Sequence, residues 1–310
     1  MNKNFILALS ILSTLSACQV NLDTNQIAEM AEQGTTVNLS QVPQQEKTYT
    51  VGTFSDIHCQ SHMKMKIQPS EKSKVVVISN ALDYLTVKNN NGRLSVQYQK
   101  NVNLKNAETK IIVYTPSFQS LEASSLGAIT VEKGFTSSNL RLAASSSGKI
   151  SGPFSCTQLE VKSSSNGNIF ADIQAQQLTA SASSSGDIKL NSTSEMMEQI
   201  QLTSSSSGTI TLKNGKAKTL YASASSSGDI SGDFSADKIN LTSSSSGDID
   251  ARISTKTLSL KASSSGDIKL SGEAQSIEAS ANSSGDINIK NVRYSNLEKS
   301  QNSSGKVITN

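Results

Sequence analysis

The sequence contains no tryptophan, and aromatic residues make up only 4% of its 310 positions. Proline and cysteine are also rare, with four and three residues. The apolar fraction is 35%, and much of the remaining weight lies in Ser, Ala, Asn and Gly, a composition typical of a disordered linker or of a repeat protein. A fixed period in the sequence separates these two classes, because only the repeat protein has one.

A strong charge of either sign is missing as well. The formal net charge is +3, and Lys and Arg occur singly among acidic residues. Binding to nucleic acid requires a row of basic side chains that neutralises successive phosphates. We therefore expect no nucleic-acid partner.

The N-terminus lacks a hydrophobic run long enough for a permanent membrane span. A basic start precedes an apolar run from Phe5 to Leu12, whereas a transmembrane helix needs about 20 apolar residues. This layout predicts a secretory signal peptide over residues 1–17. The motif Leu-Ser-Ala-Cys resembles the bacterial lipobox, which implies a lipid on Cys18, and Gln19 resembles the outer-membrane sorting pattern. The alternative is an ordinary signal peptide cleaved at the same place, with Cys18 a bystander.

A repeat dominates the rest of the chain. From residue 121 onward, a glycine recurs every 19–22 residues with an Ile or Val two positions later, often within Ser-Ser-Ser-Gly-Asp-Ile. Ten units with so little variation in length are diagnostic of a solenoid. The ten glycines are Gly127, Gly148, Gly167, Gly186, Gly208, Gly228, Gly247, Gly266, Gly285 and Gly305.

Within each unit, the apolar residues stand an even number of positions from the glycine. Around Gly228, for example, they include Leu220 and Ile230. A period of two predicts strands with one buried and one solvated face. The glycine and the serine two positions before it share the inward parity. We therefore expect the glycine to form a corner with positive φ, and that serine column to lie inside.

These units predict an all-β chain, a parallel β-helix or β-solenoid with about 19–22 residues per rung. Each rung would contain an arm of about eight residues, the glycine corner, a shorter arm and a return loop. The return loop often carries a phenylalanine, as at Phe154 and Phe234. Stacking would place identical residues above one another at about 4.8 Å.

The remaining segments flank the solenoid of residues 119–310. Residues 48–118 alternate without the glycine period and are expected to form irregular first rungs and a lid. Residues 18–47 are polar and are expected to form a tether. In the last unit Lys299 and Gln301 replace apolar or small residues, which predicts a polar cap over the exposed end.

At this point the chain resembles a known family. The segments that carry the resemblance are Gly52–Ile57, the strand and turn through Leu94, the strand Ile111–Pro116 followed by Leu121, and the run of Ser-Gly-Asp-Ile units. Together they are similar to the bacterial putative auto-transporter adhesin family with the head GIN domain. The resemblance covers residues 48–310 and implies a right-handed β-helix, a place in the cell envelope, and a binding function whose ligand is unspecified.

One column of the repeat carries carboxylates. The residue after the glycine is acidic in five units, at Asp187, Asp229, Asp248, Asp267 and Asp286. Stacked carboxylates repel one another, and a cation such as Ca²⁺ would relieve that repulsion. The alternative, which we favour, is that Asp suits a tight turn and stays solvated, because Lys149, Asn168, Thr209 and Lys306 interrupt the column.

The sequence shows few of the residue patterns that catalysis requires. Polysaccharide lyases share the β-helix and need an Arg or Lys base beside an Asp cluster, but the four arginines are dispersed, at Arg93, Arg141, Arg252 and Arg293. The two histidines, His58 and His62, are expected on the solvated side of one strand, too far apart to share a metal. Because both are expected on this exposed strand, a Ser/His/Asp triad would lack its base. No cofactor is expected.

Two cysteines lie within the predicted β region. Cys59 falls on the inward parity, and Cys156 is expected in the loop region of an early repeat. In an oxidising compartment these two cysteines could form a disulfide. Two buried free thiols fit better, because several rungs separate the two positions.

The sequence therefore favours a non-catalytic, lipid-anchored envelope solenoid that acts as an adhesin or as an interaction scaffold. Its expected partners are the membrane, through the lipid on Cys18, and a glycan or surface protein, with self-association left open. The alternatives are a pectate-lyase-like or polysaccharide-binding protein and an envelope-stress or regulatory lipoprotein.

Overall fold

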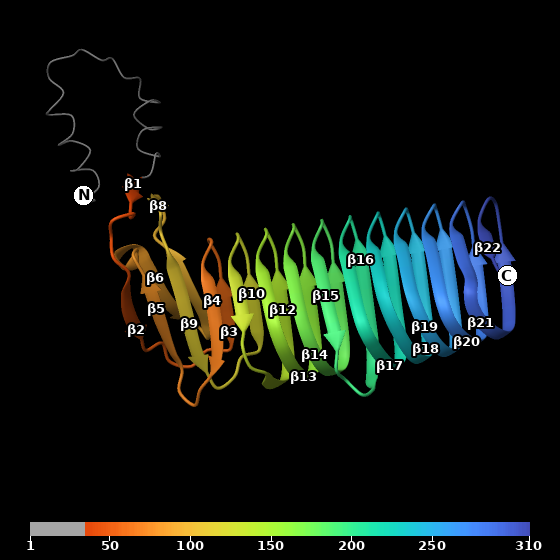
Figure 1. The fold of residues 1–310 in the computed structure, drawn as a ribbon, viewed down its shortest axis with the longest axis horizontal. Helices are drawn as coiled ribbons and strands as arrows, with labels where there is room; N and C mark the ends of the chain where they lie inside the picture. Colours follow the sequence, from red (N-terminus) through yellow and green to blue (C-terminus); the bar gives the residue numbers. More distant parts are fainter. Residues whose placement is uncertain (1–34) are drawn as a thin grey trace, which may run out of the picture.

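The computed structural model describes residues 35–310 as a long all-β rod (Figure 1). The predicted signal peptide and Cys18 lie outside the described residues. Within residues 35–310 the only helical element is the short 3-10 turn η1 (Leu82–Tyr84). No helix in this part of the chain is long and apolar enough to cross a membrane.

The strands are β1 (Thr35–Asn38), β2 (Gln45–Tyr49), β3 (Asp56–Cys59), β4 (Lys64–Pro69), β5 (Lys74–Ser79), β6 (Leu85–Asn90), β7 (Arg93–Tyr98), β8 (Val102–Lys105), β9 (Thr109–Thr115), β10 (Ser120–Ala123), β11 (Ala128–Val131), β12 (Phe135–Ala144), β13 (Lys149–Ser163), β14 (Asn168–Ala182), β15 (Asp187–Ser192), β16 (Met197–Ser205), β17 (Thr209–Ser225), β18 (Asp229–Ser244), β19 (Asp248–Ser263), β20 (Asp267–Ala281), β21 (Asp286–Gln301) and β22 (Lys306–Ile308).

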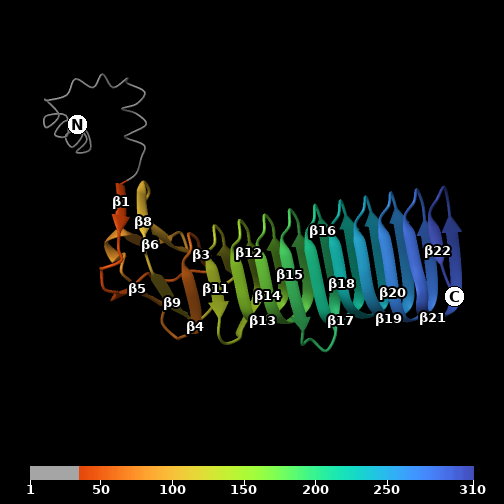
Figure 2. The same cartoon turned by 45° about the horizontal axis from the view of Figure 1, so that its top comes forward.

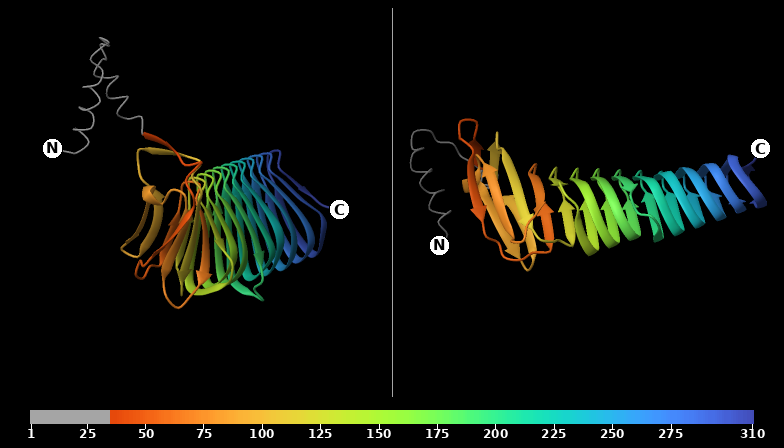
Figure 3. Two further views of the ribbon diagram at one scale, coloured as in Figure 1. Left: turned by 60° about the vertical axis from the view of Figure 1, so that its left-hand side comes forward. Right: turned by 60° about the horizontal axis from the view of Figure 1, so that its bottom comes forward.

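The repeat forms a parallel β-solenoid, as predicted. Equivalent residues of successive units pair in register, so that Ile210, Ile230, Ile249 and Ile268 stack above one another. All four side chains are buried in a core that runs the length of the rod. Figures 2 and 3 show the coils lying one behind another, with a row of narrow turns along one edge.

Each of these narrow turns is built by the serines before the repeat glycine. The glycine N–H donates to the carbonyl three residues earlier, as from Gly208 to Ser205 at 2.9 Å. Ser206 and Ser207 between them have φ values of 50° and 63°, the left-handed geometry of a type I′ turn. The inward serine column predicted two positions before the glycine is therefore wrong: Ser206 is exposed at the tip of the turn.

The repeat glycine is required for close approach and not for positive φ. Gly208 does not have a left-handed φ, in contrast to our expectation. A Cβ built on it would lie 2.5 Å from the carbonyl carbon of Ala182 in the preceding rung, and Cβ contacts below about 3 Å do not occur without a backbone shift. The crowding that the sequence predicted is confirmed, and the chain reversal belongs to the two serines.

Buried serines occur four positions before the glycine, where most units have alanine. Ser163 and Ser204 are 2% and 0% exposed. Each hydroxyl donates to the carbonyl of its own repeat glycine, Gly167 or Gly208, at 2.6 Å. A backbone acceptor within the same turn thus satisfies the buried hydroxyl and makes the polar interior tolerable.

The predicted return loop is mostly strand. β18 runs without a break through Phe234, whose side chain is 2% exposed and belongs to the core. Some of these strands carry a second glycine that the repeat does not mark, such as Gly232, with a φ of 155°. A Cβ there would lie 2.0 Å from the Leu212 carbonyl oxygen. An actual loop, residues 193–196, connects β15 to β16.

The N-terminal end is built out of sequence order. β3 lies between β7 and β10, and β4 lies between β9 and β11, with parallel pairing throughout. Antiparallel pairing of β5 with β9, and of β2 with β5, then covers the open end, as Figure 1 shows. The first rungs and lid predicted for residues 48–118 are therefore present.

The predicted tether is wrong over the part of it that the structure describes. Thr35–Asn38 (β1) pairs with β8, and Gln45–Tyr49 (β2) joins the lid. Both strands begin before residue 48, so the folded region starts within the segment that we expected to be free. Polar composition concealed these strands, because β2 is exposed at its first four residues.

The opposite end is polar, as predicted. Lys299 and Gln301 are exposed along the last long strand, β21. The Gln301 side-chain oxygen accepts the backbone N–H of Val307 at 2.6 Å. Charged and amide side chains thus occupy the edge that would otherwise offer unpaired backbone groups to another chain.

Candidate functional site

The aspartate column is assembled as the repeat predicted. Asp229, Asp248 and Asp267 pair directly in successive rungs, and Asp286 follows in the next. The column is interrupted by Thr209 before Asp229 and by Lys306 after Asp286, which are the register neighbours of these two residues.

Backbone contacts explain why aspartate suits this column. The Asp267 carboxylate accepts the N–H of Asp286 at 3.1 Å, and the Asp286 carboxylate accepts the N–H of Lys306 at the same distance. Partial burial, followed by the charges of Asp267 and Asp229, raises the pKa of Asp248. Among residues 35–310, no group of three or more His, Cys, Asp or Glu side chains has the geometry of a metal site. These two carboxylate contacts join neighbouring rungs and not residues of one turn, and cation binding by the column stays a prediction.

Three of the four arginines lie in ion pairs on the outer surface and not beside the aspartate column. Arg93 contacts Glu122 at 2.6 Å, Arg141 contacts Glu160 at 2.8 Å, and Arg293 contacts Glu273 at 2.9 Å. Each glutamate occupies a different rung from its arginine. The side chains of these pairs are 37% to 85% exposed, and ion pairs this exposed contribute little to stability.

His58 is more enclosed than predicted. Its imidazole is 16% exposed, and Nε2 lies 3.0 Å from the Ser124 hydroxyl and 3.9 Å from the Glu122 carboxylate. Burial is the main cause that lowers the pKa of His58; the Glu122 charge opposes it and the Arg93 charge adds to it. The sequence could not reveal this contact, because it depends on β10 pairing with β3.

The His58 contact differs from a hydrolase triad. Serine and glutamate both approach Nε2, whereas a catalytic acid holds the imidazole through its other nitrogen.

His62 was expected on the same strand as His58, and this prediction is wrong. It occupies the second left-handed position of the turn after β3, with a φ of 56°. His62 therefore takes the place of a turn serine.

The two cysteines of the described region are free and buried, as the sequence favoured. Burial raises the pKa of the Cys59 thiol to about 12 and that of Cys156 to about 11. Cys156 lies within β13 and not in a loop. Thiols with pKa values this high are protonated at neutral pH and are poor nucleophiles.

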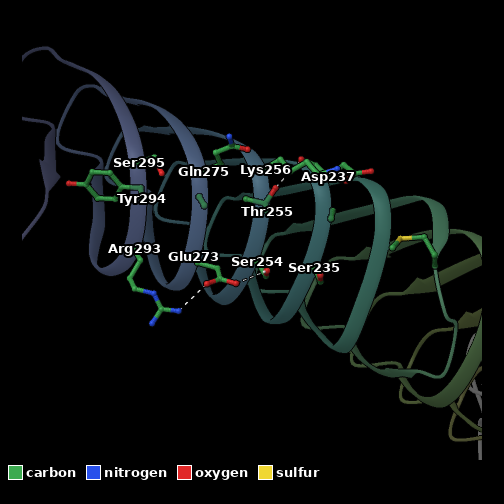
Figure 4. A pocket seen from close by; sticks show the side chains of 13 residues that line it. Ser235, Asp237, Ser254, Thr255, Lys256, Glu273, Gln275, Arg293, Tyr294 and Ser295 are labelled. Atoms are coloured by element: carbon green, nitrogen blue, oxygen red, sulfur yellow. Dashed lines mark hydrogen bonds and ion pairs between the residues drawn. The ribbon is translucent and has the colours of Figure 1, made fainter.

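An open groove of about 540 Å³ crosses strands β18 to β21 near the C-terminal end (Figure 4). Lys256 contacts Asp237 at 2.7 Å across one pair of rungs, and the Arg293–Glu273 pair crosses another. Hydrogen bonding from Arg293 lowers the pKa of Glu273. The lining also presents hydroxyl and amide groups, and its other members include Ser235, Ser254, Thr255, Gln275, Tyr294 and Ser295.

Our sequence analysis missed this groove. The signal was present as opposite charges one rung apart, at Asp237 and Lys256 and at Glu273 and Arg293. These charges neutralise one another across rungs. The groove can therefore hydrogen-bond an extended polar ligand but offers no uncompensated charge.

The fold and these surfaces define the class: a rod-shaped β-solenoid whose repeat maintains the stacking of the rungs and whose outward columns face solvent. The sequence profile of the family described as "putative auto-transporter adhesin, head GIN domain" matches residues 53–232 and 229–310. The chain belongs to this family, as the resemblance predicted.

Solved structures show the same fold. The chain is similar to a putative adhesin from Parabacteroides merdae ATCC 43184, with 13% identity and a TM-score of 0.52 over 89% of this chain and 99% of that one. It is also similar to a putative lipid binding protein from Parabacteroides distasonis ATCC 8503, with 17% identity and a TM-score of 0.51 over 89% and 99% of the two chains. At these identities the similarity establishes the fold alone. None of the curated proteins matches the sequence.

Proposed function

We propose that this protein is a lipid-anchored, non-catalytic adhesin of the bacterial cell envelope. The lipid is attached at Cys18, and residues 19–34 connect it to the rod. Membership of an adhesin family and a cell-surface role go together, and the signal-like segment of residues 1–17 supplies the route of export. Sorting to the outer membrane follows from Gln19.

The proposal rests on the contrast, within each rung, between residues that hold the rungs together and residues that face solvent. Glycine, the inward Ile or Leu, and the turn serines are all occupied in stacking. The outward side chains vary from rung to rung and face solvent. A rod of ten rungs at about 4.8 Å each holds these side chains over roughly 48 Å, which suits multivalent attachment to an extended surface.

Metabolic labelling with a palmitate analogue tests the anchor. The native chain is expected to incorporate the label, and Cys18→Ser is expected to incorporate none and to leave the membrane fraction. Protease added to intact cells should then degrade the native chain if the rod faces outward. Equal labelling of the two chains would refute attachment at Cys18, and resistance to protease in intact cells would refute display at the surface.

A further inference from the structure

The outward side of β16, β17 and β18 is unusual because its two central columns carry no charge. One column runs Gln201, Tyr221, Asn240 and the other Thr203, Ser223, Thr242, in direct register. We call these six residues the neutral face. The preceding rung adds Thr179 and Ser181, which are also uncharged.

Charged residues mark the two ends of this uncharged region. Glu160 and Lys162 are the register neighbours of Thr179 and Ser181, and Lys261 is the neighbour of Thr242. The neutral face and its preceding rung thus span four rungs of a chain in which 17% of residues are charged. Lys238, one column to the side, is the closest charge in the sequence to Asn240.

Tyr221 stands at the centre of the neutral face. Its side chain is 44% exposed although it lies in the middle of a long strand, where the neighbours along the strand are Thr219 and Ser223. An aromatic ring in this position presents a flat apolar surface with a polar tip. Hydroxyl and amide groups surround it, and no second exposed aromatic or aliphatic residue of this face accompanies it to form an apolar protein-binding core.

Asn240 adds an unmatched donor next to this ring. It is the register neighbour of Tyr221 in the following rung. Its side-chain nitrogen, Nδ2, is buried and has no hydrogen-bond partner. An unpaired buried donor is costly. Because Nδ2 is shielded from solvent, a ligand oxygen could bond it only after the Asn240 amide turns outward, which would also remove that cost.

The neutral face differs in this respect from the groove near the C-terminal end, where Lys256 and Arg293 are already paired with carboxylates. It differs also from the aspartate column, whose stacked carboxylates are acidic. With no formal charge to pair, the neutral face discriminates against charged ligands, because they would lose hydration without compensation.

We infer that the neutral face binds a neutral polysaccharide, with one sugar ring stacked on Tyr221 and sugar hydroxyls hydrogen-bonded by Gln201, Asn240 and the flanking Ser and Thr residues. Sugar rings combine an apolar C–H face with a rim of hydroxyl groups, which matches a tyrosine set among amides and hydroxyls. This inference rests on the proposed adhesin function and assigns it a ligand class and a place on the rod.

Co-sedimentation with insoluble polysaccharides tests the inference. The mature full-length chain, purified as Cys18→Ser to keep it free of lipid, is mixed with cellulose, with starch granules, and with calcium alginate gel as the anionic comparison. Tyr221→Ala, Tyr221→Phe and a control, Leu126→Ala, are measured in parallel. Leu126 is 49% exposed and lies in the first repeat turn, away from the neutral face. Far-UV circular dichroism of every variant confirms that the rod is intact.

We expect the native chain to sediment with at least one of the two neutral glucans and not with alginate. Tyr221→Ala should weaken binding about tenfold, as loss of a stacking ring would, while Tyr221→Phe and Leu126→Ala should retain it. The inference is overturned if neither glucan binds, if alginate binds more tightly, or if Tyr221→Ala and Leu126→Ala behave alike. Lipid labelling and surface display do not depend on these results, so a failure here leaves the proposed adhesin function to its own test.

Discussion

Replacing one repeat glycine by alanine should destabilise the rod through crowding alone. In Gly208→Ala, the new Cβ would lie 2.5 Å from the Ala182 carbonyl carbon and 2.6 Å from its oxygen, where ordinary contact begins near 3.4 Å. One rung must therefore move by about 0.9 Å relative to the next. That movement strains rung-to-rung bonds such as the one from Thr209 N–H to the Gly186 carbonyl, at 2.9 Å.

The cost follows from these contacts. Overpacking of a well-packed interior costs about 1–3 kcal/mol, and each weakened ladder bond adds up to about 1 kcal/mol. We therefore expect Gly208→Ala to lower the free energy of unfolding by about 1–4 kcal/mol, measured by urea denaturation followed by circular dichroism. Because φ at Gly208 is not left-handed, backbone strain contributes nothing to this value.

Gly134→Ala is the matched control. No atom lies within 4 Å of a Cβ built at Gly134, and φ there is also not left-handed. Alanine should be neutral or should stabilise the fold by about 0.4–1 kcal/mol, because it restricts the unfolded chain. If Gly208→Ala were as stable as Gly134→Ala, close rung packing would not be the reason for the repeat glycine.

Three further predictions concern the turns, the aspartate column and the thiols. Ser207→Gly should leave the melting temperature unchanged or raise it, because Ser207 has a φ of 63° and glycine adopts this geometry without strain; a clear fall would contradict the turn assignment. The raised pKa of Asp248 means that the folded chain binds this proton more tightly than the unfolded chain, so its contribution to stability is present at low pH and is lost as the pH rises through the folded pKa. Asp248→Asn should accordingly raise the melting temperature at pH 7 and change it little at pH 3. If calcium instead raised the melting temperature of the native chain and Asp248→Asn abolished that rise, cation binding by the aspartate column would be favoured. With pKa values of about 12 and 11, Cys59 and Cys156 should resist iodoacetamide at pH 8 until the chain unfolds, as followed by mass spectrometry; rapid labelling of the native chain would show that they are not enclosed.

The repeat could be read from the sequence because each rung must satisfy the same packing. A side chain that is buried in one unit, such as Ile230, must be buried in all of them, and parity then assigns every residue to the inside or outside. Where the chain leaves the strand, parity no longer holds. Ser206 and Ser207 occupy left-handed positions that Asn and Gly usually fill, so neither composition nor alternation identified the turn.

Contacts that depend on the spatial order of the strands could not be predicted from the sequence in this way. β3 is paired with β10, although about sixty residues separate them in the sequence, and this pairing encloses His58 against Ser124 and Glu122. Nothing in a single sequence indicates that β3 lies beside β10. The position of the neutral face could have been predicted from the sequence, since parity places Tyr221 outside and the period places Gln201 and Asn240 beside it. Its proposed role depends on the exposure of the Tyr221 ring and on the unpaired Asn240 amide, which only the structure shows.

Attachment of cells tests the adhesin proposal most directly. Cells that lack the protein, cells that carry the native chain and cells that carry Cys18→Ser would be compared for retention under flow on surfaces coated with neutral polysaccharide, with anionic polysaccharide or with protein. The account predicts retention by cells with the native chain and loss of it in both other strains, because the rod acts only when anchored. Equal retention of all three strains would contradict it.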